Sequence, residues 1–210
     1  MKAVGRAIKI FILVLIFLVI AAFAFRFWLQ SYYPEGMRRM IPTDALRDAY
    51  LAGTLEAKTQ EIRVGYEDPD EGLFFADHMV VVPSTGSLQV TVRYNKSTLL
   101  ALSERYGDGF DAEAEAPFVY RIFCSTGTAE DGETIVGETY LPLDSRKDSF
   151  AMYYYERLAF EGVELDGVYW IRLEIYRPGE EKPEGSIVIY ENHEKYNKFE
   201  EYKVTSEELS

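Results

Sequence analysis

The sequence predicts a mainly β protein, in which one N-terminal transmembrane helix and a short connecting helix precede an antiparallel β-sandwich. Three observations support this fold class. Ile10–Phe25 is an unbroken run of sixteen apolar residues, and apolar residues at helical spacing follow Pro42. From Glu61 onward, apolar and polar residues alternate with a period of two, which is typical of strands that bury one face.

Residues 7-29 are long enough to cross a lipid bilayer. A helix rises about 1.5 Å per residue, so this stretch spans about 34 Å, against a hydrocarbon core of about 30 Å. Trp28, Tyr32 and Tyr33 follow it, as aromatic residues do at a membrane–water boundary. We therefore expect residues 7-29 to be the membrane anchor and to contact lipid. Together with a short cytoplasmic tail, this anchor makes up the first segment of the chain, residues 1-30.

A signal peptide is the alternative for residues 1-30, because Ala22–Ala24 has the small–x–small form of a signal-peptidase site. We favour an uncleaved anchor, since the apolar run is long and stays aromatic past that site. Basic residues precede the run at Lys2, Arg6 and Lys9. They favour a cytoplasmic N-terminus and an extracytoplasmic C-terminal domain at the cell membrane.

Residues 31-60 form the predicted connector, which contains an amphipathic helix. Thr43 or Asp44 can cap its first turn, and Leu46 and Ala49 lie on one face. That face either packs on the following domain or docks on another membrane protein.

Residues 61-204 form the predicted sandwich, with a tail at residues 205-210. "SLQVTVRY" shows the pattern that defines its strands, because Leu88, Val90 and Val92 alternate with polar residues. One helix interrupts the strands over Thr98–Tyr106 and ends at Gly107.

The stretch "LDGVYWIRLEIY" resembles the corner that opens the penultimate strand of immunoglobulin-like sandwiches. Asp166, Gly167 and Tyr169 carry this resemblance, which implies an immunoglobulin-like fold with Tyr169 packed inward. The inward face continues through Ile171, Leu173 and Ile175. Trp170 and Tyr176 are left on the opposite face.

Exposed aromatic residues are the predicted binding groups: Trp170, Tyr176, Tyr153 and Tyr155. Tyrosine and tryptophan anchor protein partners at a low cost in conformational entropy. They also stack on sugar rings, as in carbohydrate-binding modules, which the chain resembles in architecture. Packing within a thick core is the third interpretation.

The charge of the chain is -13, and it is unevenly distributed. Residues 48–210 hold fifteen Lys and Arg against thirty-three Asp and Glu. Such an acidic domain repels phosphate backbones, so no nucleic acid is expected as a partner.

Candidate metal ligands and catalytic groups are few. Two acidic loops could hold Ca²⁺, one through Asp108, Asp111 and Glu113 and the other through Asp68 and Asp70. Neither has the spacing of an EF-hand, so we expect no cofactor. The chain has two histidines and one cysteine, and none of the common catalytic motifs.

The sequence therefore predicts a non-enzymatic binding or assembly subunit for another membrane or surface protein. A cell-surface carbohydrate-binding module is the alternative. A hydrolase that uses paired carboxylates is a further alternative, because acidic residues are abundant.

Overall fold

The computed structural model describes residues 2–31, 33–65, 74–128, 135–192 and 198–209. The chain divides into two compact units, Met1–Pro34 and Glu35–Ser210. The first unit contains helix α1 (Lys2–Ser31). The second unit contains all the strands that the structure describes, and the protein as a whole has more strand than helix, 41% against 28%.

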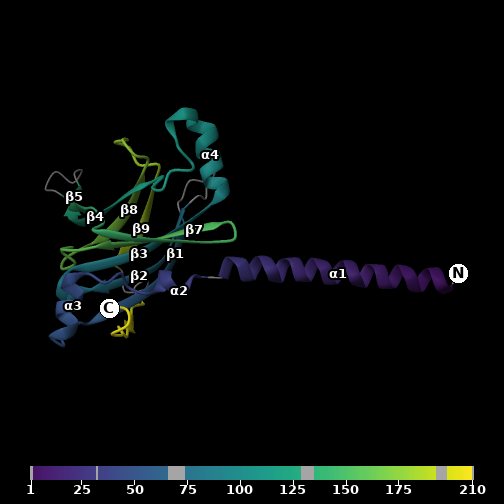
Figure 1. Cartoon of the computed structure of the whole chain (residues 1–210), viewed down its shortest axis with the longest axis horizontal. Helices are drawn as coiled ribbons and strands as arrows, with labels where there is room; N and C mark the ends of the chain where they lie inside the picture. The colour runs from purple at the N-terminus through teal and green to yellow at the C-terminus, as the bar shows by residue number, and fades with distance from the viewer. Residues whose placement is uncertain (1, 32, 66–73, 129–134, 193–197, 210) are drawn as a thin grey trace. The chain divides into compact units, whose positions relative to one another are not determined.

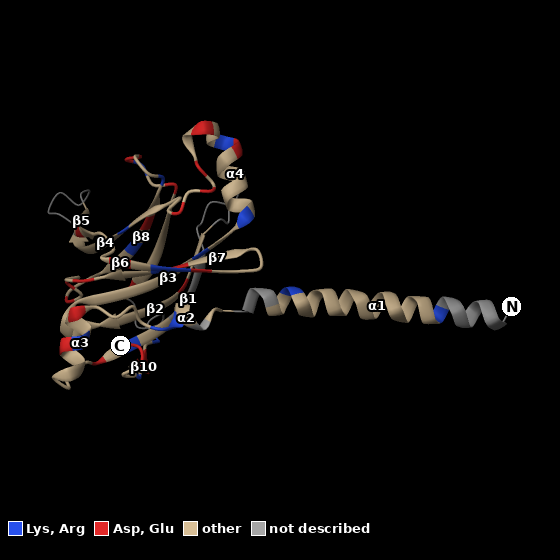
Figure 2. Cartoon of the chain, viewed as in Figure 1, with Lys and Arg blue, Asp and Glu red and all other residues tan. Residues whose placement is uncertain are grey.

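Helix α1 exposes its apolar surface along its described length. The stretch Lys9–Trp28 has no buried residue, and the middle of the helix carries no charged residue (Figure 2). Its length and composition allow it to cross a membrane and equally allow it to be a signal sequence.

The second unit is built from two antiparallel sheets (Figure 1). The larger sheet has the order β10-β1-β2-β3-β7-β6 and the smaller sheet the order β5-β4-β8-β9. The strands are β1 (Ala57–Gly65), β2 (Phe74–Val82), β3 (Ser87–Asn95), β4 (Val119–Thr128), β5 (Ile135–Tyr140), β6 (Asp144–Phe150), β7 (Tyr153–Phe160), β8 (Trp170–Tyr176), β9 (Gly185–Glu191) and β10 (Glu200–Tyr202). The predicted mainly β chain with one apolar N-terminal helix is therefore confirmed.

The two sheets share one apolar core. The larger sheet contributes residues such as Leu88 and Leu158, and the smaller sheet contributes Ile122, Ile171 and Leu173. The predicted alternation is correct for this inward face of β8. Tyr169, however, precedes β8, and its side chain is 62% exposed, so the prediction that it packs inward is wrong.

The outer face of the larger sheet is covered by the segment 35–51. This segment contains α2 (Glu35–Arg38) and α3 (Asp44–Leu51), and Thr43 caps α3 by accepting a hydrogen bond from Leu46 N. Leu46 packs with Val80 and Val82 of β2, so the apolar face of α3 lies on the domain. Three buried side chains, Met37, Met40 and Ile41, complete this second layer.

Polar side chains of the larger sheet form hydrogen bonds to the backbone of the covering segment 35–51. The Gln89 amide accepts from Ile41 N and donates to Ile41 O, both at 2.8 Å. Thr91 Oγ1 donates to Met37 O at 3.0 Å, and Arg146 Nη1 donates to Gly36 O at 3.3 Å. These side chains thus satisfy the carbonyl groups of Gly36 and Met37 and both backbone polar groups of Ile41.

Helix α4 (Lys96–Tyr106) lies between β3 and β4 and matches the predicted helix closely. Asn95 caps it, accepting from Thr98 N at 2.9 Å. Gly107 ends it with a positive φ of 53°, a conformation that glycine adopts readily. Two short 3₁₀ turns, η1 (Pro83–Thr85) and η2 (Gly107–Gly109), complete the elements.

Candidate functional site

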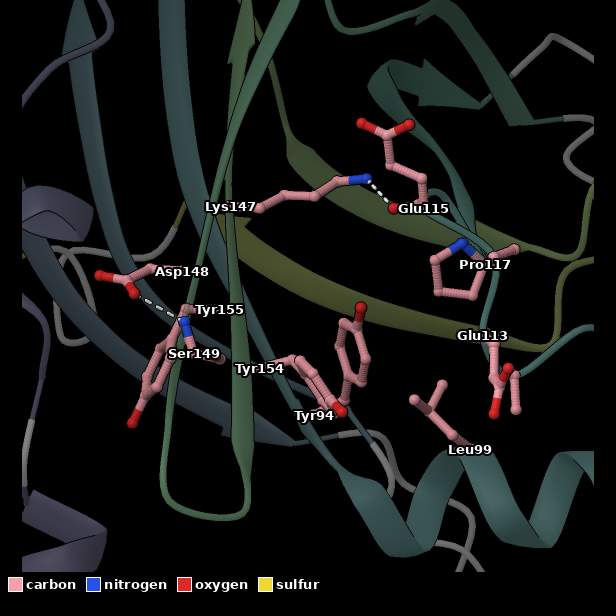
Figure 3. A pocket seen from close by; sticks show the side chains of 12 residues that line it. Tyr94, Leu99, Glu113, Glu115, Pro117, Lys147, Asp148, Ser149, Tyr154 and Tyr155 are labelled. Atoms are coloured by element: carbon pink, nitrogen blue, oxygen red, sulfur yellow. Dashed lines mark hydrogen bonds between the residues drawn. The ribbon is translucent and has the colours of Figure 1, made fainter.

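A pocket of about 580 Å³ opens beside β3, β6 and β7, next to α4 and the loop that follows it (Figure 3). This volume lies within the range of small-ligand sites in proteins. Its lining residues come from five separate stretches of the chain: Tyr94, Leu99, Ala112, Glu113, Ala114, Glu115, Pro117, Lys147, Asp148, Ser149, Tyr154 and Tyr155.

Two tyrosines form the inner wall of the pocket. Tyr94 and Tyr154 are paired across β3 and β7, and their ring centres lie 5.5 Å apart at an interplanar angle of 27°. Burial raises the pKa of the Tyr94 hydroxyl, which is therefore protonated at neutral pH. Leu99 of α4 adds an aliphatic surface beside them.

Charged residues form the rim. Glu113 and Glu115 come from the acidic loop after α4, and Lys147 comes from the edge strand β6 (Figure 3). The next residue on β6, Asp148, pairs with Tyr155 and points to the opposite face of the sheet. The Lys147 ammonium donates to Glu115 O and lies 3.7 Å from Glu156 Oε1. The rim thus has two carboxylates and one cation, and that cation already has two partners.

Glu156 is buried behind Lys147, on the face of β7 that carries the core residue Leu158. Burial raises the pKa of this carboxyl group, and the Lys147 ammonium and the hydroxyls of Tyr120 and Ser145 oppose only part of that effect.

Arg177 holds the start of the acidic loop in place by contacts with Tyr106, Glu184 and Gly109. The Arg177 guanidinium stacks on the Tyr106 ring, with Cζ 3.6 Å from the ring centre. Arg177 Nε donates to Glu184 Oε1 at 2.5 Å, and the Tyr106 hydroxyl donates to Glu184 Oε2 at 2.9 Å. Arg177 Nη1 also donates to Gly109 O. This cluster joins the end of α4 to the connection between β8 and β9.

The predicted aromatic residues do not form one site. Trp170 and Tyr176 lie on the outer face of the smaller sheet, whereas Tyr153 and Tyr155 lie on the outer face of the larger sheet. Trp170 and Tyr153 are half-buried.

Tyr155 and Tyr176 are buried, so the prediction that they are exposed is wrong. For Tyr176 the reason is local: the Arg121 guanidinium covers its ring at 4.4 Å, and its hydroxyl donates to Glu174 at 2.6 Å. Tyr155 lies on the face that the segment 35–51 covers, beside the side chain of Arg93. Arg93 also stacks on Tyr153, with Cζ 5.1 Å from the ring centre.

The outer face of the smaller sheet keeps an accessible group of aromatic and cationic side chains. Arg172 Cζ lies 5.2 Å from the Trp170 ring and 5.6 Å from the Phe123 ring, and Arg172 pairs with Glu174 at 2.7 Å. Val188 and Tyr169 are exposed near this group. We call Phe123, Trp170, Arg172 and Val188 the smaller-sheet face.

The predicted calcium ligands are only partly described. Asp68 and Asp70 lie outside the described residues. Asp108, Asp111 and Glu113 are exposed, and Asp111 Oδ1 accepts a hydrogen bond from Glu113 N. Among the described residues, no three His, Cys, Asp or Glu side chains converge where they could hold a metal ion.

The one histidine that the structure describes, His78, and the single cysteine, Cys124, are both buried. His78 is buried between Thr59 and Arg157, and burial together with the Arg157 charge lowers its pKa to about 3. Burial raises the pKa of the Cys124 thiol to about 12. A neutral imidazole without solvent access and a protonated thiol are suited to packing rather than to nucleophilic attack. His193 lies outside the described residues.

Comparison of the chain with protein-family models, curated proteins and solved structures finds no match.

Proposed function

We propose that the chain is a single-pass membrane protein whose C-terminal domain is extracytoplasmic and acts as a non-enzymatic binding or assembly subunit for another membrane or surface protein. The observation that carries the proposal is the twenty-residue apolar stretch of α1, none of which is buried. Apolar surface left in water costs about 25 cal/mol per Å², so a bilayer would stabilise this helix strongly.

The topology of the domain supports an immunoglobulin-like sandwich. When the strands are lettered in chain order from β2, the two sheets read A-B-E-D and C′-C-F-G, which is the order of immunoglobulin domains. Strands β1 and β10 then extend the first sheet at its edge. Sandwiches of this kind commonly serve as recognition modules on cell surfaces, although fold alone does not decide function.

A short connection favours a partner near the bilayer. Only residues 32–34 separate α1 from α2. An extended chain spans at most roughly 3.5 Å per residue, so an inserted α1 would keep the domain near the membrane surface.

The smaller-sheet face supports protein recognition. Tryptophan, tyrosine and arginine are the residues that most often dominate the binding free energy of protein–protein complexes. Arg172 already covers Trp170 and pairs with Glu174, so the face is ordered before any partner arrives.

The test is cross-linking of the full-length, tagged chain in its native membrane, followed by identification of the captured protein. A matched chain carries an unrelated membrane helix in place of residues 1–31. A partner captured by both chains, and captured about tenfold less by Trp170→Ala, supports recognition through the domain. Leu51→Ala, which changes a side chain 83% exposed on α3, is the control that should keep full capture.

Loss of capture with the exchanged helix would assign recognition to α1. Retention of the wild-type chain on polysaccharide beads without any captured protein would replace the proposal by the carbohydrate-binding alternative.

A further inference from the structure

We propose that the pocket beside α4 takes a lysine or arginine side chain of the protein partner, with its charge at the carboxylates of Glu113 and Glu115 and its aliphatic stem on Tyr94 and Tyr154. This inference rests on the proposed function and gives the pocket a specific role in it.

The charge of the rim is uncompensated. Neither rim carboxylate forms an ion pair with another described residue, and the Lys147 ammonium is directed to Glu115 O and Glu156. The net charge of residues 48–210 is also strongly negative. A cationic group that approaches the pocket is therefore attracted both by the rim and by the whole domain.

The inner wall suits the stem of such a side chain. Tyr94 and Tyr154 present aromatic surface, and Leu99 and Pro117 add aliphatic surface (Figure 3). Lysine and arginine bury their methylene groups against surfaces of this kind while the charged head stays hydrated, and a ring within about 6 Å adds a cation–π attraction.

Two clusters elsewhere in the domain combine an arginine guanidinium with a tyrosine ring and a carboxylate. Arg177 lies on the Tyr106 ring and is held by the Glu184 carboxylate. On the smaller sheet, Arg121 lies on the Tyr176 ring, whose hydroxyl donates to Glu174. The pocket presents tyrosine rings and carboxylates without the guanidinium that completes both of these clusters.

The pocket fits an organic cation better than a metal ion. A metal ion needs several oxygen ligands within about 2.6 Å of one point. No group of three such side chains is present among the described residues, and the pocket volume of about 580 Å³ far exceeds that of an ion.

The direct test uses the full-length chain in phosphatidylcholine nanodiscs and the probe peptide Ac-Gly-Arg-Gly-NH₂, with NMR of the Leu99 methyl groups as the readout. We expect saturable shifts with a Kd on the order of 1 mM, as befits a small ligand. The peptide with citrulline in place of arginine has the same shape without the charge and should bind at least about tenfold more weakly.

Glu113→Gln with Glu115→Gln should weaken binding of the arginine peptide about tenfold, whereas Glu164→Gln with Glu181→Gln, at exposed positions elsewhere, should leave it unchanged. Equal binding of the arginine and citrulline peptides, or no shift of Leu99, would overturn the inference.

Cross-linking separates this inference from the proposed function. Undiminished capture of the partner by the Glu113→Gln, Glu115→Gln chain would remove the role of the pocket and leave the proposed function intact. Binding of the arginine peptide in a chain that captures no partner would contradict the proposed function instead. Binding of free spermidine at a much lower concentration than the peptide would overturn the inference and assign the pocket to a soluble polycation.

Discussion

The side-chain amide of Gln89 is joined to the backbone of Ile41 by two hydrogen bonds of 2.8 Å. Both residues are buried, and they lie 48 positions apart in the sequence. The pair fastens the segment that follows α1 to the middle strand β3 of the larger sheet. The covering segment 35–51 is therefore held to the sheet by hydrogen bonds to its backbone as well as by apolar packing.

Gln89→Leu should destabilise the domain by about 2 kcal/mol, because it leaves a buried N–H and a buried C=O of Ile41 without partners. Equilibrium urea unfolding of the full chain in detergent measures this loss, and amide exchange at Ile41 should become faster. Gln89→Glu is the informative companion: it keeps an acceptor for Ile41 N but turns a second oxygen toward Ile41 O, so it should cost at least as much. Unchanged stability in both variants would show that the segment is held by apolar packing alone.

His78 should make the domain sensitive to acid. Arg157 Nη1 lies 2.9 Å from His78 Nδ1, and arginine can only donate, so Nδ1 accepts and Nε2 carries the proton toward Thr59 Oγ1. Burial, the Arg157 charge and the Arg38 charge lower the pKa of His78 from 6.5 to about 3.

The unfolded chain consequently binds a proton at His78 below pH 6.5, and the folded chain does so only near pH 3. Stability should therefore fall on acidification through this window by up to about 1.4 kcal/mol per pH unit. His78→Gln removes the titrating group, so its unfolding free energy should change less between pH 6.5 and pH 4 than that of the wild type. An equal slope in the two proteins would contradict the assignment of a neutral His78.

Titration of Glu156 should change the stability of the domain with pH in the opposite direction. Its pKa is raised in the folded chain by burial, so the stability it contributes is fully present below the ordinary pKa of 4.5 and is lost as the pH rises through the raised value. Glu156→Gln should stabilise the domain at pH 8 relative to the wild type and have little effect at pH 4. Thermal unfolding at the two pH values measures the difference, with the exposed Glu104→Gln as the control that shows none.

The inward faces of the strands could be predicted from the sequence, because side chains alternate between the two faces of a strand and the apolar ones mark the face that is buried. Ile171, Leu173 and Ile175 are all in the core, as their spacing indicates. Strand β6 could not be predicted in this way. Its residues are mostly polar, and it pairs with β7 at the sheet edge through backbone groups, where charged side chains are tolerated.

The outward faces could not be predicted, because their burial depends on segments far away in the sequence. Tyr155 is buried beside Arg93 of the neighbouring strand, on the face that residues 35–51 cover, and the ring of Tyr176 is covered by Arg121 of the neighbouring strand. The pocket escaped prediction for the same reason. The acidic loop at Glu113 was recognisable, but only strand pairing places Tyr94 beside Tyr154 and only the fold brings them to that loop.

The orientation of α1 is the central claim, and thiol labelling in intact cells tests it most directly. Cys124 is buried and its pKa is raised to about 12, so the wild-type chain should stay unlabelled by a membrane-impermeant maleimide. Glu181→Cys, in the exposed connection between β8 and β9, should be labelled in intact cells. Lys2→Cys should be labelled only after lysis. Labelling of Lys2→Cys in intact cells with protection of Glu181→Cys would contradict the extracytoplasmic domain, and a mature chain that lacks residue 2 would replace the anchor by a cleaved signal peptide.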